Sequence, residues 1–329
     1  MIFLRRGRGS KEGFKAKLAL PPNFICTRVR AHKTTFTFLI NLPQIILSLL
    51  IISALICLPQ LLAAWGANGH RVVAQICYDN LTPEARIRVD DALGDNYLAQ
   101  VSTWPDYIKA EKGWDFAKSW HYMTVQPDET PSDVAIGNQR KPKIDDVREG
   151  IELMVDILKG NAEARGRMTD LLAENKLEPL AGSLDATALA FLIHFIGDVH
   201  QPMHVGKNRD LGGNKISVLY FGERKNLHSV WDSGILEHER LSYTEFADFA
   251  TMHTRARKAQ WENAPLAEWI SESIELRERL YNTLYDRTDR ETGLPEFSWD
   301  YQHDFLPVVE DRLAAAVYRA AALLIGIYK

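Results

Sequence analysis

Histidine and aspartate residues are concentrated in the eleven-residue segment "HFIGDVHQPMH", residues 194–204. The surrounding residues are apolar, so the pattern predicts a buried helix whose ionisable side chains need partners. His194 and Asp198 are four residues apart, which places them on the same face of a helix. Pro202 ends that helix, so His204 can approach the same region from another direction. This combination of imidazole and carboxylate groups favours a metal site over isolated core histidines.

Two further groups of residues extend the pattern. His228 and Asp232 lie in "NLHSVWD", again four residues apart. His70 ends "WGANGH", Asp106 ends "WPD" and His121 lies in "WHY". Five imidazoles and three carboxylates exceed the four ligands of one zinc ion, and a set without thiolates is typical of catalytic zinc. The histidines of residues 65–329 that lack such a setting, and that we interpret as ordinary core or surface residues, are His200, His238, His253 and His303.

Helices must position these residues, because most segments between them have helical periodicity. We expect helices at 82–94, 145–159 and 185–199, one that opens at Pro265, and a last one from about Val308. In the second of these helices, Ile151, Val155 and Leu158 form the expected buried stripe. One strand is expected, "KISVLYFG" at residues 215–222, paired across a turn in "GERKN". The absence of a Gly-rich phosphate loop and of βαβ alternation argues against a nucleotide-binding sheet. The sequence therefore predicts an all-α class, a mainly helical single domain with a small β-hairpin.

The first 64 residues differ from the rest of the chain. Nine Lys or Arg residues accompany one Glu there, and no charged side chain occurs from Thr34 to His70. A basic segment, the apolar run "QIILSLLIISALICL" and a small-residue end are typical of a secretory signal peptide. The run is shorter than the roughly 20 residues of a membrane span, although an uncleaved anchor is the alternative. We predict that residues 1–64 are removed by a cut between Ala64 and Trp65, and that residues 65–329 form one secreted or periplasmic domain.

Charge and cysteine content limit how this domain can work. The whole chain has a formal charge of −4, and the basic leader leaves residues 65–329 with −12. Extended binding of duplex DNA needs many Lys or Arg contacts with phosphate, which this balance does not favour. Cys26 and Cys57 lie in the leader, so Cys77 has no partner for a disulfide within residues 65–329. Packing and metal binding must therefore stabilise the domain.

Six motifs occur in a fixed order: "WGANGH", "WPD", "WHY", "HFIGDVHQPMH", "DLGGN" and "NLHSVWD". Together they resemble the zinc-dependent single-strand nucleases of the nuclease S-one/P-one family, within the phospholipase C/nuclease superfamily. The resemblance covers essentially all of residues 65–240. It implies a mainly helical domain with a metal-lined cleft, and the single cysteine of residues 65–329 points to the bacterial type.

The resemblance implies three zinc ions per chain. The first would be bound by Asp106, His121, His194 and Asp198. The second would share Asp198 as a bridge and would also be bound by His70 and by the amino nitrogen and carbonyl oxygen of Trp65. The third would be bound by His204, His228 and Asp232. The residues with catalytic roles would be Asp106, Lys109 and Asp198.

The resemblance also implies where a substrate would lie. Tyr122 occupies the position at which fungal members stack a base, and Leu211 would form the opposite wall. Asn214, in "DLGGN", would also contact the substrate. Two positions depart from the fungal pattern. Lys109 replaces an arginine, which removes bidentate contact with phosphate, and Thr124 replaces an aspartate, which puts base preference in doubt.

These features predict an endonuclease that hydrolyses single-stranded DNA and RNA to 5′-mononucleotides, and that also has 3′-nucleotidase activity. The expected chemistry uses a hydroxide activated by the zinc ions. The expected substrates include 3′-nucleotides, and nothing implies a protein partner or a stable membrane association after signal cleavage. A zinc-dependent phospholipase C is the main alternative. A periplasmic zinc-binding protein without catalysis is a second one.

Overall fold

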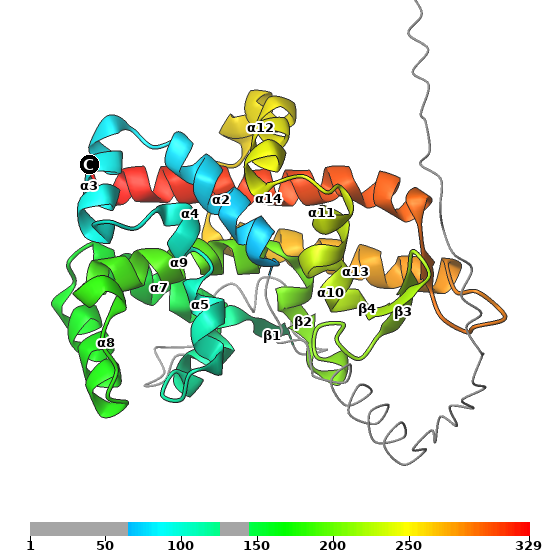
Figure 1. Cartoon of the computed structure of the whole chain (residues 1–329), viewed down its shortest axis with the longest axis horizontal. Helices are drawn as coiled ribbons and strands as arrows, with labels where there is room; N and C mark the ends of the chain where they lie inside the picture. The colour runs from blue at the N-terminus through cyan, green and yellow to red at the C-terminus, as the bar shows by residue number, and fades with distance from the viewer. Residues whose placement is uncertain (1–64, 126–144) are drawn as a thin grey trace, which may run out of the picture. The chain divides into compact units, whose positions relative to one another are not determined.

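Helix α9 (Leu184–His200) is the central helix of the part of the chain that the computed structural model describes, residues 65–125 and 145–329. Every residue of α9 from Ala186 to His200 is buried, as its almost wholly apolar sequence predicts. The helices α2 (Ala67–Asp79), α7 (Val147–Leu158), α13 (Leu266–Asp286) and α14 (Trp299–Ile327) all contact it. Figure 1 shows α14 running alongside α9.

Further helices complete the domain around this centre. They are α3 (Pro83–Leu93), α4 (Leu98–Val101), α5 (Trp104–Tyr107), α8 (Ala162–Glu174), α10 (Leu227–Ser229), α11 (Ile235–His238) and α12 (Tyr243–Thr254). The expected helix at 82–94 is confirmed, because the Thr82 hydroxyl accepts the N–H of Ala85 and Gly94 ends the helix with a φ of 59°. The mainly helical class is confirmed as well. Within the described residues, no helix has both the length and the apolar character needed to cross a membrane.

The strands are short and form two small sheets. In one, β1 (Met123–Val125) pairs in parallel with β2 (Val205–Lys207). In the other, β3 (Ser217–Tyr220) lies between β4 (Glu223–Asn226) and β5 (Glu296–Phe297). The predicted hairpin is present, but the turn predicted in "GERKN" is wrong. Those residues form most of β4, and the turn is Phe221–Gly222, where φ values of 48° and 78° suit a two-residue hairpin loop.

Two helix predictions also need correction. The last helix begins at Trp299 rather than near Val308, because the buried rings of Tyr301 and Phe305 continue its apolar face before Pro307. In α7, Ile151 is buried as expected, but Val155 and Leu158 are only partly buried. The face that packs on α9 instead includes Met154 and Ile157.

Candidate metal centre

The carboxyl end of α9 carries the first two predicted ligands. His194 and Asp198 are one turn apart and have no solvent exposure, and the helix ends two residues later at His200. Gln201 then leaves the helical conformation, and Pro202–His204 form a short 3-10 turn. The predicted arrangement of this segment is therefore confirmed, since His204 reaches the ligand cluster from beyond the end of α9.

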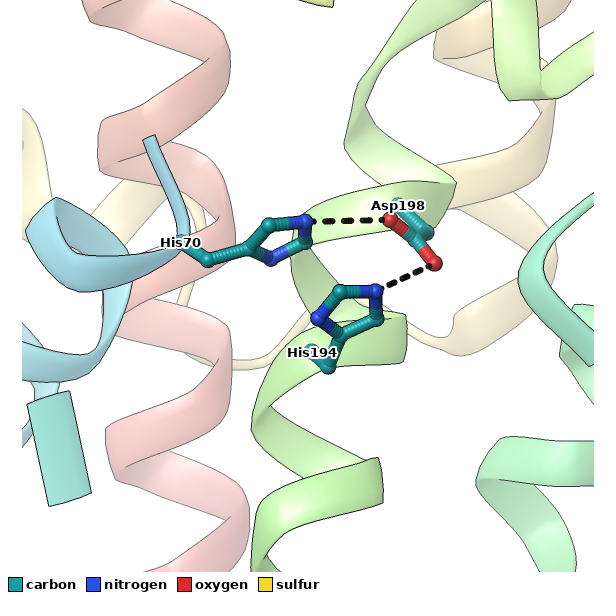
Figure 2. Close-up of side chains that lie close together, drawn as sticks. All are labelled: His70, His194 and Asp198. Atoms are coloured by element: carbon teal, nitrogen blue, oxygen red, sulfur yellow. Dashed lines mark ion pairs between the residues drawn. The ribbon is translucent and has the colours of Figure 1, made fainter. Parts of the chain in front are cut away.

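The Asp198 carboxylate faces imidazoles from different elements. Its Oδ1 lies 3.5 Å from Nε2 of His70, on α2, and its Oδ2 lies 3.4 Å from Nε2 of His194 (Figure 2). The Nδ1 of His121, which ends a 3-10 turn at Asp115–His121, lies 3.1 Å from the same Oδ2. One buried carboxylate thus faces imidazoles from α2, from α9 and from the turn that ends at His121.

Asp106 lies beside the same imidazoles. It belongs to α5, and its Oδ1 is 3.5 Å from Nε2 of His194 and 4.0 Å from Nδ1 of His121. The Nζ of Lys109, three residues later, contacts that oxygen at 2.6 Å. The predicted cation near the phosphate site therefore pairs with a predicted metal ligand in this structure.

A second group of ligands lies next to Asp198, since the Nδ1 of His204 is 3.8 Å from its Oδ1. His228 and Asp232 come from α10 and the following π-helical turn, Val230–Gly234, and their Nε2 and Oδ2 atoms are 3.0 Å apart. The Nε2 of His204 lies 3.6 Å from the Oδ1 of Asp232. All three side chains are buried.

Backbone carbonyls fix the orientation of three imidazoles. The Nδ1–H groups of His194, His204 and His228 donate to the carbonyl oxygens of Ser102, His121 and Gly212 at 2.7, 2.6 and 2.7 Å. Each bond sets the tautomer that leaves Nε2 with a lone pair directed into the cluster. The imidazoles are thus held in the form that binds metal.

Burial favours the neutral form of three of the ligand histidines and disfavours the charge of the central carboxylate. It lowers the pKa of His70 and His121 well below the ordinary value and also lowers the pKa of His204. It raises the pKa of Asp198 well above the ordinary value, although the positive charge of Lys109 opposes this shift. A buried cation would satisfy this carboxylate and would use the neutral imidazoles as ligands.

Unpartnered polar atoms show that these residues fit a metal ion. Both ring nitrogens of His70, Oδ1 of Asp198 and Nε2 of His204 are buried and make no hydrogen bond within the described residues. Such atoms are costly unless something binds them. The Nδ1 of His121 faces the Nε2 lone pair of His194 at 3.0 Å, an approach that requires a proton or a cation between them. A set of imidazole nitrogens and carboxylate oxygens suits zinc.

Three groups of buried or partly buried ligands could each hold a metal ion. They are His70, His194 and Asp198; Asp106, His121 and His194; and His204, His228 and Asp232, each with ligand atoms within 4.8 Å of one another. Eight of the nine predicted metal ligands are thus brought together. The ligand that two groups share differs from the expected one. His194 belongs to two of these groups, whereas the resemblance implies that Asp198 is shared between two metal ions.

Trp65 is the ninth predicted ligand, and its ligand role remains a prediction. Its side chain is fully buried. The next residue, Gly66, donates its N–H to the carbonyl oxygen of Asp232 at 2.5 Å. A Cβ on Gly66 would meet the Oγ of Ser233 at 2.2 Å, so a larger residue here would force that hydroxyl to move. The start of the described chain is therefore tied to the segment that carries Asp232.

A cavity of about 440 Å³ adjoins the ligands, and His121, His204 and His228 form part of its wall. All four predicted substrate residues line this same cavity: Tyr122, Thr124, Leu211 and Asn214. The pairing of β1 with β2 brings Tyr122 and Thr124 close to the segment after His204. A larger hollow of about 1040 Å³, between α2, α3 and α4, contains none of the predicted ligands.

Two large apolar side chains are exposed in the cavity. Tyr122 is 47% exposed and Leu211 is 53% exposed, so neither serves as a core residue. Leu211 lies in the left-handed region with a φ of 55°, and Asp210 braces its loop by accepting the N–H of Gly213 and the hydroxyl of Tyr281, each at 2.8 Å. Leu211 is therefore held out towards the cavity. Sequence reasoning missed further lining residues. Met203 lies in the segment 194–204 but was given no role, and no motif marked Lys118, Lys207 and Asn208.

Fold and site together define a mainly helical protein with buried histidine and aspartate clusters beside a cavity. The family model described as S1/P1 Nuclease matches residues 65–329. Nuclease S1 of Aspergillus oryzae is 30% identical over 290 residues, which cover 83% of this chain and 94% of that protein. Endonuclease 4 of Arabidopsis thaliana is 30% identical over 284 residues, covering 80% and 89%. Nuclease P1 of Penicillium citrinum is 32% identical over 172 residues, covering 51% and 57%.

The chain belongs to the S1/P1 nuclease family. Members of this family are hydrolytic nucleases, so the protein is a hydrolase whose substrates are nucleic acids. The family resemblance expected from the six motifs is thereby confirmed.

Proposed function

We propose that this chain is an endonuclease, dependent on three zinc ions, that cuts single-stranded DNA and RNA to 5′-mononucleotides and also hydrolyses 3′-nucleotides. The observation that carries the proposal is the position of the cavity. Tyr122 and Leu211 are exposed in the hollow that His121, His204 and His228 line, so a stacked base would place its phosphate beside the ligand clusters. A duplex base is already stacked and paired, whereas a single-stranded base is free to enter.

The buried ligands would hold the zinc ions, with Asp106, His121, His194 and Asp198 around the first and His204, His228 and Asp232 around the third. His70, Asp198 and the start of the chain at Trp65 would hold the second. When bound, zinc supplies an activated water at neutral pH and neutralises charge on the phosphate and the leaving oxygen. The protein contributes fixed imidazole tautomers and a site from which bulk water is largely excluded.

The remaining cavity residues would orient the substrate. The Tyr122 ring offers a face on which any base can stack, and the Thr124 hydroxyl and Asn214 amide can hydrogen-bond to a base edge. Lys109 would supply a point charge to the phosphate, and it is held near the clusters by its 2.6 Å contact with Asp106. The hydroxyl of Thr124 has no negative charge, so we expect a base preference unlike that of members with aspartate there.

Local charge explains how an acidic protein would bind a polyanion. Residues 65–329 carry −12, but three zinc ions against three ligand carboxylates leave about +3 concentrated at the site. Capture would therefore depend on the metal centre and on stacking rather than on an extended basic surface. This suits a short contact with a loop or a strand end.

We also propose that residues 1–64 are a signal peptide and that the mature, bacterial-type protein is secreted or periplasmic. The match to the family model begins at Trp65, and Ala63 and Ala64 are small enough for a signal-peptidase cut there. Cleavage would free the amino nitrogen of Trp65 as a ligand. Edman sequencing or intact mass of exported protein tests this, and an uncleaved leader would support the membrane-anchored alternative.

Hydrolysis of two substrate classes tests the proposal against the alternatives. We expect the zinc-loaded protein to release acid-soluble nucleotides from denatured DNA faster than from duplex DNA, and to lose this activity with a chelator. Faster hydrolysis of phosphatidylcholine than of denatured DNA would favour a phospholipase C. Zinc binding without hydrolysis of either substrate would favour a zinc-binding protein and would contradict the proposal.

A further inference from the structure

Gln201 makes two contacts that the metal-ligand set does not use. It follows the last residue of α9, and its side chain has no solvent exposure. Its side-chain oxygen accepts the N–H of Met203 at 2.5 Å, and its side-chain amide group donates to the Oδ1 of Asp232. Because a backbone N–H occupies the oxygen, the NH₂ group must be the end that faces Asp232. The orientation of this amide is therefore fixed by its surroundings.

The two oxygens of the Asp232 carboxylate have different neighbours. Oδ1 accepts from Gln201, while Oδ2 faces the Nε2 of His228 at 3.0 Å. A hydrogen bond to the charged form stabilises a buried carboxylate and holds its plane. Gln201 therefore holds the plane of the Asp232 carboxylate in place, with Oδ2 turned towards His228.

The contact with Met203 acts on a second ligand. The amide oxygen closes the turn Pro202–His204, and the backbone N–H of His204 donates to the carbonyl oxygen of Gln201 at 3.0 Å. The end of α9, just before this turn, is held by two other hydrogen bonds. Ser273 donates to the carbonyl oxygen of Val199 at 2.6 Å, and Arg312 donates to that of His200 at 3.1 Å. One side chain thus links the placement of His204 to that of Asp232, 28 positions further along the chain.

We propose that Gln201 is a positioning residue for the third metal site, and that it sets the affinity of the His204–His228–Asp232 cluster for zinc without touching the metal. The inference rests on the proposed binding of zinc. Groups that orient metal ligands typically change metal affinity by about 10–100-fold when replaced. The effect should fall on the third site, because the side-chain ligands of the first two sites lie on α2, α5, α9 and the turn ending at His121, and none of them is hydrogen-bonded to the side chain of Gln201.

Two substitutions separate the contacts of Gln201. Gln201→Glu keeps an acceptor for Met203 but turns a second carboxylate oxygen towards Asp232. Gln201→Met keeps the approximate shape and removes both contacts. The matched control is Gln302→Met. Gln302 is also buried, and its side-chain amide is hydrogen-bonded to Tyr220, to the carbonyl oxygen of Ile235 and to Glu239 rather than to a predicted ligand.

Zinc content and zinc titration measure the effect directly. After dialysis against a chelator-buffered zinc series, we expect wild type to bind three ions and Gln302→Met to bind three ions with the affinities of wild type. Both Gln201 variants should bind two ions as wild type does, and the third about 10–100-fold more weakly. Three ions bound with wild-type affinities, or an equal weakening of all three, would overturn the inference. Fewer than three ions on wild type would instead contradict the proposed function.

Thermal unfolding distinguishes positioning from a general loss of stability. The rise in Tm between chelator-treated and zinc-loaded protein should be smaller for the Gln201 variants than for wild type and for Gln302→Met. If the Gln201 variants lose the same number of degrees with and without zinc, or fold in neither condition while the control folds, Gln201 has a structural role only and the inference is wrong.

Discussion

The imidazole rings of His70 and His194 are stacked, with centroids 3.7 Å apart and an interplanar angle of 11°, and each faces a different oxygen of Asp198 (Figure 2). Two imidazolium ions would repel one another in this arrangement, and both burial and His194 lower the pKa of His70. The pair therefore places two imidazole nitrogens against the two oxygens of one carboxylate. That geometry suits a carboxylate shared between two cations.

Asp198→Asn should abolish nuclease activity and lower the zinc content, because an uncharged amide cannot offset the repulsion of two bound cations. We expect a loss of more than about 100-fold in kcat, beyond the range of residues that only orient a ligand. Asp185→Asn is the control, since Asp185 lies in the first turn of the same helix, is only partly buried and pairs with Arg165 rather than with the ligands. Normal zinc content and rate in Asp198→Asn would show that Asp198 only caps or pairs locally.

The same substitution should stabilise the metal-free protein at high pH. Burial raises the pKa of Asp198, so folding favours the protonated carboxyl. Its contribution to the free energy of unfolding is complete below the unfolded-state pKa of about 4 and is lost as the pH rises through the folded-state pKa. With chelator at pH 8, Asp198→Asn should unfold at a higher temperature than wild type, and the difference should shrink towards pH 4. A lower Tm for the variant at pH 8 would contradict this.

Tyr122→Ala should spare the metals and weaken substrate binding. Loss of base stacking costs roughly 1–3 kcal/mol, which corresponds to an increase in KM of about 5- to 150-fold. Zinc content should stay at the wild-type value, because Tyr122 is exposed and is not a ligand. Tyr285→Ala, at an 88% exposed tyrosine outside the cavity, should leave KM unchanged. A wild-type KM for Tyr122→Ala would remove Tyr122 from the binding site.

The N-terminus gives a fourth prediction. If the amino nitrogen of Trp65 binds zinc, it must be free, because an amide nitrogen has no available lone pair. Protein made without export and beginning Met-Trp65 should fold, bind fewer than three zinc ions and be much less active. The control is the same protein after proteolytic removal of the methionine, which should again bind three zinc ions, including the one at the second site. Full activity with three ions in the Met-Trp65 form would refute this ligand.

Local spacing explains which ligands the sequence could predict. His194 and Asp198 share a helical face, and Pro202 ends that helix, so their meeting with His204 follows from neighbouring residues alone. His228 and Asp232 have the same spacing, although the chain between them forms a π-helical turn that the sequence did not indicate. Their distance of 3.0 Å still results, because the spacing places both side chains on one side of the turn.

Contacts between distant segments could not be predicted in this way. The strands β1 and β2 are three residues long, too short to show a period, yet their pairing brings Tyr122 and Thr124 to the cavity. The bond from Gln201 to Asp232 has no counterpart in sequence spacing. The start of α14 was missed for a related reason, since the packing of Tyr301 and Phe305 extends the helix to before Pro307.

The most direct test of the account is the chemistry of the products from a single-stranded oligonucleotide. Zinc-loaded protein should convert it to fragments and mononucleotides with 5′-phosphates and 3′-hydroxyls, and chelator should stop the reaction until zinc is restored. Mass spectrometry of the products shows whether the phosphate is on the 5′ or the 3′ end. Products that carry 3′-phosphates, or cleavage that continues undiminished in chelator, would contradict a zinc-dependent nuclease whose metal centre stabilises the departing 3′ oxygen.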